Sequence, residues 1–168
     1  LDVDCLCSSN TKSFYEGGGL FVFPTAAAVM TMLDSLHVEY GSKKFVIMGR
    51  GKLVGKPVRF LLEQRGSFVE VVNRETEDIS ALTRNADIII AATGKPGILT
   101  GSMVKPGSII IDAGTAEEDG GIVGDVDFDS VSKVAGYISP VPGGVGPVTV
   151  AQLLENVVMV AEQGSVKL

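Results

Sequence analysis

The fold is decided by residues 45–72, which read FVIMGRGKLVGKPVRFLLEQRGSFVEVV. This stretch begins with the short apolar run FVIM and ends with FVEVV, which is apolar except for Glu70, and such runs are typical of strands. Between them lie a glycine-rich loop over residues 49–55 and a predicted helix from Pro57 to Arg65, which Gly66 ends. A strand, a helix and a second strand in this order predict a βαβ unit, whose two strands are parallel.

The rest of the chain continues this alternation. Continuous apolar strands that alternate with helices indicate a parallel sheet covered on both faces. We therefore expect an α/β fold, a Rossmann-like doubly wound, mostly parallel sheet with helices on both faces, forming one domain over residues 1–168. The other expected strands are 87–91, 108–112 and 137–138, and the other expected helices are 24–36, 78–84, 127–134 and one from Pro147 that Gly164 closes; residues up to 19 are expected to be irregular and residues 117–121 to be an exposed loop.

The composition is that of a globular protein without a basic surface. The chain has 168 residues, 45% of them hydrophobic, and a mean hydropathy of +0.33, so it has enough apolar material for a core. Its net charge of -6 and pI near 4.8 argue against nucleic-acid binding, which requires a basic footprint. Apolar runs such as residues 86–92 are too short to cross a bilayer. We expect no nucleic-acid partner, no membrane partner and a cytoplasmic location.

Cys5 and Cys7 are the only cysteines, and His37 is the only histidine. The restrictive geometry of a disulfide leads us to expect no bond between the two cysteines, and a reducing compartment fits their small number. A structural metal site needs more thiol or imidazole ligands than this chain offers. We therefore expect no bound metal.

The loop at residues 49–55 contains the pattern Gly-x-Gly-x-x-x-Gly, which differs in spacing from the dinucleotide-binding fingerprint. It follows a strand and precedes a helix, so its backbone N–H groups and the positive end of the helix should face a pyrophosphate. The alternative is a glycine turn that serves packing only. We predict cofactor contacts at Gly49, Arg50, Gly51, Val54 and Gly55.

The second strand ends in Asn73, Arg74 and Glu75, where NAD-binding folds tend to place an acid for the ribose hydroxyls. Here the guanidinium of Arg74 can pair with the 2′-phosphate of NADP, and Arg50 offers a second cation. We therefore predict NADP as the cofactor, with NAD possible because Glu75 could accept from a ribose hydroxyl. The alternative for Arg74 is a solvated residue at a strand end.

Further cofactor contacts are expected where later strands end, since ligands of open α/β sheets bind at the carboxyl edge. The loop from Thr93 to Gly97 should border the nicotinamide ribose, with contacts from Thr93 and Gly94, and Gly114 should lie similarly after the strand at 108–112. Asp112 is equally suited to accept from local backbone N–H groups and to bind a ligand. Asp125 is interpreted as a turn or capping residue rather than a catalytic acid.

Residues 139–149 read SPVPGGVGPVT, with three prolines and three glycines directly before a helical pattern. The glycines allow positive φ and close backbone approach, whereas the prolines fix φ. Such a loop has little freedom to collapse and is suited to holding a ligand. The alternative is a tight turn between a strand and a helix.

The same loop carries a resemblance. PVPGGVGP at residues 140–147 resembles the signature near the C-terminus of the methylenetetrahydrofolate dehydrogenase/methenyltetrahydrofolate cyclohydrolase family. The resemblance covers nearly the whole chain, but only the C-terminal, cofactor-binding portion of that family. The other segments that agree, in order, are residues 2–4, 49–50, 54–57, 86–88, 94–97, 104–107, 111–114 and 124–126.

This resemblance implies oxidation of 5,10-methylenetetrahydrofolate by NADP, hydrolysis of the methenyl product to 10-formyltetrahydrofolate, and a homodimer. The family's catalytic lysine and tyrosine lie in an N-terminal domain that has no counterpart here. We therefore expect no catalytic residue in this chain and no dehydrogenase activity of the chain alone. The resemblance assigns contacts with the folate substrate to Asp4, Pro142, Gly143, Gly144, Val145 and Gly146.

The chain also departs from the family pattern. Gly51 stands where the family has serine, Cys5 stands where it has glycine, and residues 23–26 read FPTA instead of PCTP. Two other classes stay open. One is a non-catalytic nucleotide-binding or assembly module. The other is a shikimate dehydrogenase-like reductase, which shares Asn73-Arg74 but does not explain the loop at residues 139–149.

Overall fold

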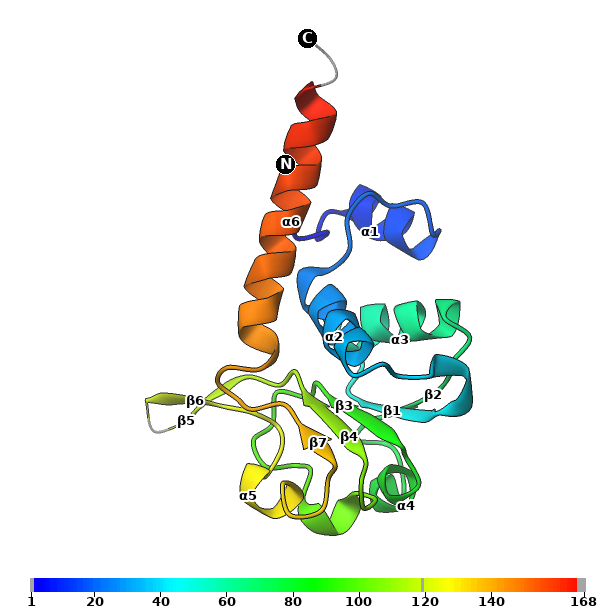
Figure 1. The fold of residues 1–168 in the computed structure, drawn as a ribbon, viewed down its shortest axis with the longest axis vertical. Helices are drawn as coiled ribbons and strands as arrows, with labels where there is room; N and C mark the ends of the chain where they lie inside the picture. The colour runs from blue at the N-terminus through cyan, green and yellow to red at the C-terminus, as the bar shows by residue number, and fades with distance from the viewer. Residues whose placement is uncertain (1, 119, 166–168) are drawn as a thin grey trace.

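The computed structural model describes residues 2–118 and 120–165 of the chain, with side chains described as far as residue 162. Its main sheet is built from β1 (Lys44–Met48), β2 (Phe68–Val72), β3 (Ile88–Ala91), β4 (Ile109–Asp112) and β7 (Tyr137–Ile138). All neighbouring pairs are parallel, in the spatial order β2-β1-β3-β4-β7 (Figure 1). The expected five strands are therefore confirmed, to within one residue at each end.

Helices cover both faces of this sheet, as expected. They are α1 (Ser8–Tyr15), α2 (Pro24–Ser35), α3 (Gly55–Gln64), α4 (Ile79–Arg84), α5 (Phe128–Val131) and α6 (Val145–Ser165), with the short 3-10 turns η1 (Tyr40–Ser42) and η2 (Gly101–Met103). Successive side chains of a strand point to opposite faces. Phe45 and Ile47 of β1 therefore join the cluster under α2 and α3, whereas Val46 and Met48 join the cluster that contains residues of α4 and α5.

The strand order also creates a switch point. The chain passes from β1 to β2 on one side and returns to β3 on the other side of β1. The loops that follow β1 and β3 therefore diverge at the carboxyl edge of the sheet, which is where open α/β sheets bind ligands.

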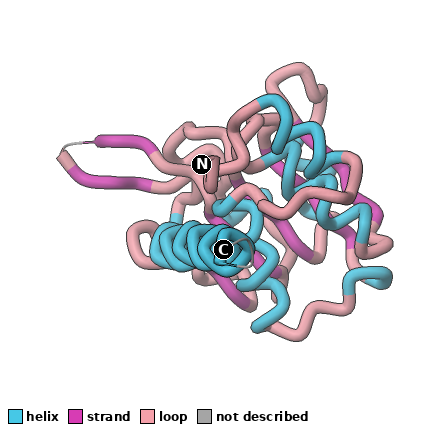
Figure 2. The backbone as a smooth tube through the Cα atoms, turned by 90° about the horizontal axis from the view of Figure 1, so that it is seen from above, coloured by secondary structure: helices cyan, strands magenta, loops and turns pink. Residues whose placement is uncertain are grey.

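The N-terminal segment and the stretch near residue 119 differ from expectation. Residues 8–15 form α1 instead of irregular chain, because the Asp2 carboxylate accepts from the backbone N–H groups of Leu6 and Cys7 and the Phe14 ring packs edge-on against Phe23. Residues 117–121 are exposed where described, but they belong to a hairpin of β5 (Ala116–Glu118) and β6 (Gly121–Val123) that projects from the domain (Figure 2). Residue 119 lies outside the described residues.

Helix boundaries also differ in detail. Helix α3 begins at Gly55, two residues before Pro57, and α5 is one turn long instead of spanning residues 127–134. Helix α6 continues through Gly164, so this glycine does not close the helix as expected. The cysteines at positions 5 and 7 are both free, in agreement with the sequence.

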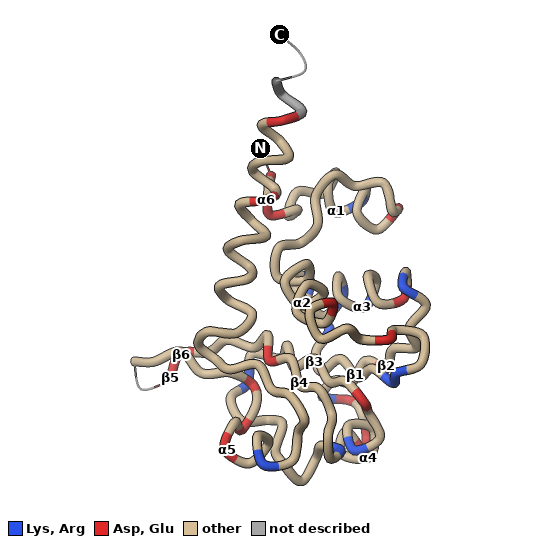
Figure 3. The backbone as a smooth tube through the Cα atoms, in the orientation of Figure 1, with Lys and Arg blue, Asp and Glu red and all other residues tan. Residues whose placement is uncertain are grey.

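Helix α6 extends well beyond the sheet (Figure 1). It packs against α2, and the buried Asn156 side chain donates to the backbone oxygens of Val3 and Val22 at 2.7 and 3.0 Å. Its side chains Val150, Leu154, Val157 and Val158 are exposed, and its first ten residues carry no charge (Figure 3). By length and composition alone, Val145–Glu162 could cross a membrane, and 11% of this window is buried. This helix is longer than the apolar runs, such as residues 86–92, that the sequence analysis considered.

An ionic cluster ties the end of α2 to the end of α3. The guanidinium of Arg65 donates to both Asp34 carboxylate oxygens and lies 4.7 Å from the centre of the Tyr40 ring, whose hydroxyl also donates to Asp34 at 2.6 Å. Hydrogen bonds from Arg65, and secondarily from Tyr40, hold the pKa of Asp34 below its usual value, against a smaller opposing effect of burial.

This cluster predicts a pH-dependent contribution to stability. Because the folded pKa of Asp34 is lowered, its contribution is present above the unfolded value near 4 and is lost as pH falls through the folded pKa. Asp34→Asn should lower the free energy of unfolding at pH 7 by about 1 kcal/mol or less, since both partners are partly exposed. Urea titrations from pH 7 to pH 2 should show this difference shrinking below about pH 4. A difference that is independent of pH, or an equal effect of Glu77→Gln at an exposed carboxylate, would contradict the assignment.

Candidate cofactor-binding site

A cavity of about 370 Å³ lies at the switch point, where the loops after β1, β2 and β3 meet. Its floor is apolar and its rim carries charged and amide side chains. The lining residues are Met48, Gly49, Arg50, Gly51, Val72, Asn73, Arg74, Glu75, Ile79, Ala92, Thr93, Lys95 and Ile98. We call this space the first cavity.

The glycine loop requires its first and last glycines for close backbone packing. Gly49 has a φ of 109°, and a Cβ at this position would come within 2.3 Å of the Ala92 carbonyl oxygen. A Cβ at Gly55 would come within 2.2 Å of the Gly49 carbonyl oxygen. Around Gly51, by contrast, no atom lies within 4 Å of an added Cβ. Gly49 and Gly55 therefore allow close backbone packing in this loop, whereas Gly51 lines the cavity and has free space beside it.

The start of α3 is suited to an anion. No side chain caps this helix, and it directly follows the glycine loop. Of its first residues, Pro57 has no N–H and the Lys56 N–H donates to the Gly51 carbonyl oxygen at 3.0 Å, so the positive end of the helix dipole, rather than a row of free donors, favours an anion here. The loop and the helix start therefore fit a pyrophosphate group, as the sequence pattern predicts.

Three cations line the first cavity, namely Arg50, Arg74 and Lys95. The Arg50 guanidinium lies 3.3 Å from the Glu75 carboxylate, and both side chains are largely exposed. Arg74 is exposed as well, and its backbone belongs to a turn held by the Asn73 side chain, which accepts from the Glu75 N–H at 2.7 Å. The rim thus offers two guanidinium groups near the end of β2, one of them already paired.

A second cavity of about 500 Å³ lies at the carboxyl end of β4, beneath the start of α6. All five loop residues that were predicted to contact substrate line it. The lining residues are Thr25, Leu53, Val54, Asp112, Ala113, Gly114, Thr115, Ile122, Pro140, Val141, Pro142, Gly143, Gly144, Val145, Gly146, Pro147 and Thr149.

The three glycines of this loop differ in what they contribute to its structure. Only Gly143 adopts a positive φ, of 103°. Gly144 is buried, and a Cβ there would come within 2.4 Å of the Pro140 carbonyl oxygen, so packing and not φ requires glycine. Gly146 is exposed and has open space around an added Cβ. Of the two properties expected of these glycines, positive φ is used at Gly143 and close backbone approach at Gly144, whereas Gly146 requires neither.

The predicted cofactor residues divide among three places. Gly49, Arg50, Gly51, Arg74 and Thr93 line the first cavity. Val54 and Gly114 line the second cavity instead. Gly55 lines neither cavity and serves loop packing, whereas the Gly94 N–H donates to Asp125.

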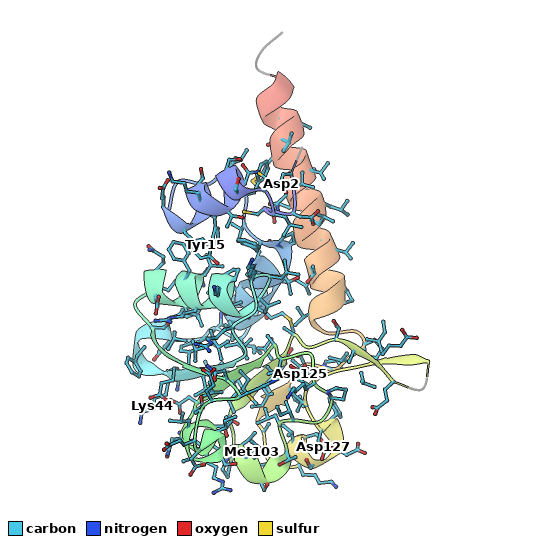
Figure 4. The ribbon with its side chains drawn as sticks, turned by 180° about the vertical axis from the view of Figure 1, so that it is seen from behind. Asp2, Tyr15, Lys44, Met103, Asp125 and Asp127 are labelled. Carbon is cyan, nitrogen blue, oxygen red and sulfur yellow. The ribbon has the colours of Figure 1, made fainter. Side chains whose placement is uncertain are left out.

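Asp4 is not brought to either cavity. It is exposed, and its neighbour Val3 is held by Asn156, eleven residues into α6 from Val145, which corresponds to roughly 16 Å along the helix. Figure 4 likewise shows Asp2 beside the upper part of α6 and Asp125 beneath its lower end. Cys5 is buried with a φ of 61°, which accounts for the glycine that the family places there. Contact between Asp4 and a substrate stays a prediction.

Sequence reasoning missed several lining residues. Lys95 belongs to the loop at residues 93–97 that the sequence placed beside the nicotinamide ribose, but it was not among the predicted contacts. Ile79 and Ile98 in the first cavity, and Thr25 and Ile122 in the second, come from segments whose approach depends on the tertiary fold. No local pattern marks such residues as part of a site.

Two carboxylates are buried between the cavities. Asp112 is 3% exposed and accepts from the N–H groups of Gly114, Asp125 and Val126. Asp125 is fully buried and accepts from the loop that follows β3. Burial raises the pKa of Asp112, while its backbone hydrogen bonds act in the opposite direction. Both residues therefore act as acceptors for backbone N–H groups, one of the two roles considered for Asp112.

A switch point in a parallel sheet, a close-packed glycine loop before an uncapped helix and a basic rim define a dinucleotide-binding domain of the Rossmann type. The comparison with protein families agrees. The family model described as "Tetrahydrofolate dehydrogenase/cyclohydrolase, NAD(P)-binding domain" matches residues 24–165, and the chain belongs to this family. The resemblance stated from the sequence is confirmed.

Individual relatives show the same similarity. The chain is 47% identical over 165 residues to the bifunctional protein FolD of Bordetella bronchiseptica, covering 98% of this chain and 58% of the relative. Among solved structures it is similar to the bifunctional enzyme FolD of Campylobacter jejuni, with 42% identity and a TM-score of 0.89 over 96% of this chain and 58% of that one. It is also similar to FolD of Trypanosoma brucei complexed with NADP cofactor and inhibitor, with 40% identity and a TM-score of 0.90 over 99% of this chain and 60% of that one. The chain thus spans little more than half the length of these proteins.

The glycine loop gives a prediction with a matched control. Gly51→Ser should change the free energy of unfolding by less than about 0.5 kcal/mol, because an added Cβ meets nothing there. Its hydroxyl should tighten the binding of NADP up to about tenfold by donating to a phosphate oxygen. Gly49→Ser should instead cost about 1–3 kcal/mol of stability through backbone strain and overlap. Urea unfolding and titration calorimetry measure both effects. Equal destabilisation by the two variants would show that the loop is packed differently.

Proposed function

We propose that this chain is the NADP-binding part of an enzyme that oxidises 5,10-methylenetetrahydrofolate to 5,10-methenyltetrahydrofolate and hydrolyses this product to 10-formyltetrahydrofolate. The observation that carries the proposal is the presence of two cavities at one edge of the sheet, one built for a dinucleotide and one formed by the PVPGGVGP loop. The full-length relatives are named bifunctional proteins, which supports two linked reactions.

The two cavities adjoin each other through Asp125. Its carboxylate accepts from Thr93, which lines the first cavity. A Cβ added to Gly114, which lines the second cavity, would come within 2.1 Å of the Asp125 carboxyl carbon. A dinucleotide that extends from the first cavity past Thr93 would therefore bring its far end toward the second. This arrangement supports placing a nicotinamide next to a substrate.

NADP supplies the redox chemistry when it is bound, by accepting a hydride. The protein's part is to hold and orient it. The glycine loop and the start of α3 would bind the pyrophosphate, and Arg74 and Arg50 would bind the 2′-phosphate. The Trypanosoma brucei structure, which contains NADP, supports this choice of cofactor. Glu75 weakens it, because this carboxylate competes with a phosphate for Arg50.

The folate would enter the second cavity, with contacts from Pro142 to Gly146. The domain arrangement assumed from the resemblance stays a proposal: the catalytic lysine and tyrosine would come from a separate domain. The exposed stripe Val150, Leu154 and Val157 on α6 supports this, since its four-residue and three-residue spacing forms one apolar face suited to packing against protein. The same domain would have to bring a folate to Asp4 for that contact to form.

The remaining assignments are part of the same proposal. We propose a cytoplasmic homodimer without nucleic-acid or membrane partners. The net charge of -6 supports the absence of nucleic acid, and the hydrogen bonds from Asn156 of α6 to the backbone of Val3 and Val22 support packing of this helix in a protein. A non-catalytic nucleotide-binding module has less support, because it gives no reason for the second cavity.

Cofactor selectivity tests the first cavity. The chain should bind NADP more tightly than NAD, and Arg74→Ala should weaken NADP by about 1.5–3 kcal/mol, as expected for a lost charge-assisted bond to phosphate, while NAD changes little. Titration calorimetry with both nucleotides measures this. Arg84→Ala is the matched control, since Arg84 donates to the Ser102 carbonyl and lines neither cavity. Equal or tighter binding of NAD by the wild-type chain would refute the choice of NADP.

The folate assignment is tested at Gly146, where the structure leaves room for a side chain. In the protein joined to the N-terminal domain of a relative, Gly146→Val should lower the turnover of methylenetetrahydrofolate about tenfold or more by filling the second cavity. NADP affinity and the unfolding midpoint should stay close to wild type. The 168-residue chain alone should bind NADP but show no turnover. Turnover by the chain alone, or a parallel loss of NADP binding in the variant, would overturn the division of roles.

A further inference from the structure

The buried carboxylates Asp112 and Asp125 have no part in the chemistry proposed above. Both lie at the carboxyl edge of the sheet, one at the end of β4 and the other after β6. Burying a charged group is costly unless hydrogen bonds satisfy it. The hydrogen-bond partners of these two carboxylates therefore indicate their role in the structure.

Asp125 binds one short loop with four donors. The N–H and the hydroxyl of Thr93 and the N–H groups of Gly94 and Lys95 all donate to its carboxylate. The distances to the Thr93 hydroxyl and the Lys95 N–H are 2.9 and 2.8 Å. Three successive N–H groups of a loop are thus held by a single side chain that is 31 residues distant in sequence from Gly94.

Asp112 in turn holds Asp125. Its two oxygens accept from the N–H groups of Asp125 and Val126 at 3.1 and 3.0 Å. The backbone N–H of Asp112 donates to the hydroxyl of Ser139, directly before the PVPGGVGP loop, at 2.8 Å. A continuous set of hydrogen bonds therefore runs from the loop of the second cavity to the loop of the first.

Two glycines make room for these carboxylates. A Cβ at Gly124 would come within 2.0 Å of an Asp112 carboxylate oxygen, and one at Gly114 within 2.2 Å of an Asp125 oxygen. Neither glycine has a positive φ, so backbone conformation does not require them. Glycine is therefore required at both positions because any side chain there would overlap one of the two carboxylates.

We propose that Asp125 is a positioning residue for the nicotinamide half of the nucleotide site, fixing the Thr93–Lys95 loop at the wall of the first cavity while Asp112 fixes Asp125. Thr93 and Lys95 line this cavity, and Gly94 between them has a φ of 68°. Without the carboxylate, the three N–H groups lose their acceptor and the loop is free to move into the space that a ligand occupies. The proposal rests on the proposed function, because its ligand is NADP.

Asp125→Asn tests this with little change in size. The amide keeps one acceptor oxygen, but its NH2 group faces N–H donors, so at least one loop contact is lost. NADP affinity should fall about tenfold or more. The affinity for adenosine 2′,5′-bisphosphate, which reaches only the Arg50 and Arg74 end, should change less than about twofold. Asp112→Asn should weaken NADP in the same direction but by less, since its amide can no longer accept from both the Asp125 and Val126 N–H groups, while Leu99 still holds this backbone.

Asp127→Asn is the matched control. Asp127 lies two residues away and caps α5 by accepting from the Ser130 N–H, with no hydrogen bond to the Thr93–Lys95 loop among the described residues. It should leave both affinities unchanged within about twofold. Equal weakening of both ligands by Asp125→Asn, or no weakening of NADP, would overturn the proposal. Failure of the wild-type chain to bind NADP would instead overturn the proposed function.

Amide hydrogen exchange of the wild-type chain tests the same point without a variant, should Asp125→Asn not fold. The N–H groups of Thr93, Gly94 and Lys95 should exchange slowly although they lie in a loop, because each donates to a buried carboxylate. The exposed Gly51 should exchange fast by comparison, since no hydrogen bond from its N–H is present in the described part of the chain. Exchange of all three loop amides at the rate of Gly51 would contradict the proposal.

Discussion

The arrangement of both cavities depends on two buried carboxylates that accept hydrogen bonds from the loops around them. Asp112 and Asp125 together receive seven donors, six of them backbone N–H groups, from segments that follow β3, β4 and β6. The segments after β3 and β4 leave the main sheet at its carboxyl edge, whereas residues 124–126 follow the β5–β6 hairpin and pair with Leu99 through one isolated parallel bridge. The side-chain acceptors add to this short pairing, so the loops keep a fixed geometry with little regular secondary structure.

Close backbone approach is the second constraint. The loop after β1 packs so tightly against the loop after β3 that Gly49 has no room for a Cβ beside Ala92, and Gly55 has none beside Gly49. This contact brings the start of α3 to the switch point of the sheet. The sheet itself is buried on both faces and provides a rigid base. Rigid strands and pinned loops together give a preformed site, which lowers the entropic cost of binding a long ligand.

The sequence predicted the sheet well because buried parallel strands are continuous apolar runs, such as Ile88–Ala91, that local pattern can identify. It predicted the loop at residues 142–146 and the glycines of the first loop for a similar reason. The sequence-based predictions failed where tertiary packing determines the local structure. Helix α1 depends on the contacts of Asp2 and Phe14, and the need for glycine at Gly144 arises from the Pro140 carbonyl across the turn. The roles of Asp112 and Asp125 also depend on partners far apart in sequence, which no single pattern joins.

We propose that the first cavity holds the dinucleotide with its phosphates on the glycine loop. A crystal structure of the chain grown with saturating NADP tests this most directly. We expect the pyrophosphate within hydrogen-bonding distance of the backbone at Gly49–Gly51, the 2′-phosphate beside Arg74, and the nicotinamide extending past Thr93 toward Gly114. A nucleotide bound elsewhere, or bound in the first cavity with its pyrophosphate away from the glycine loop, would contradict the account.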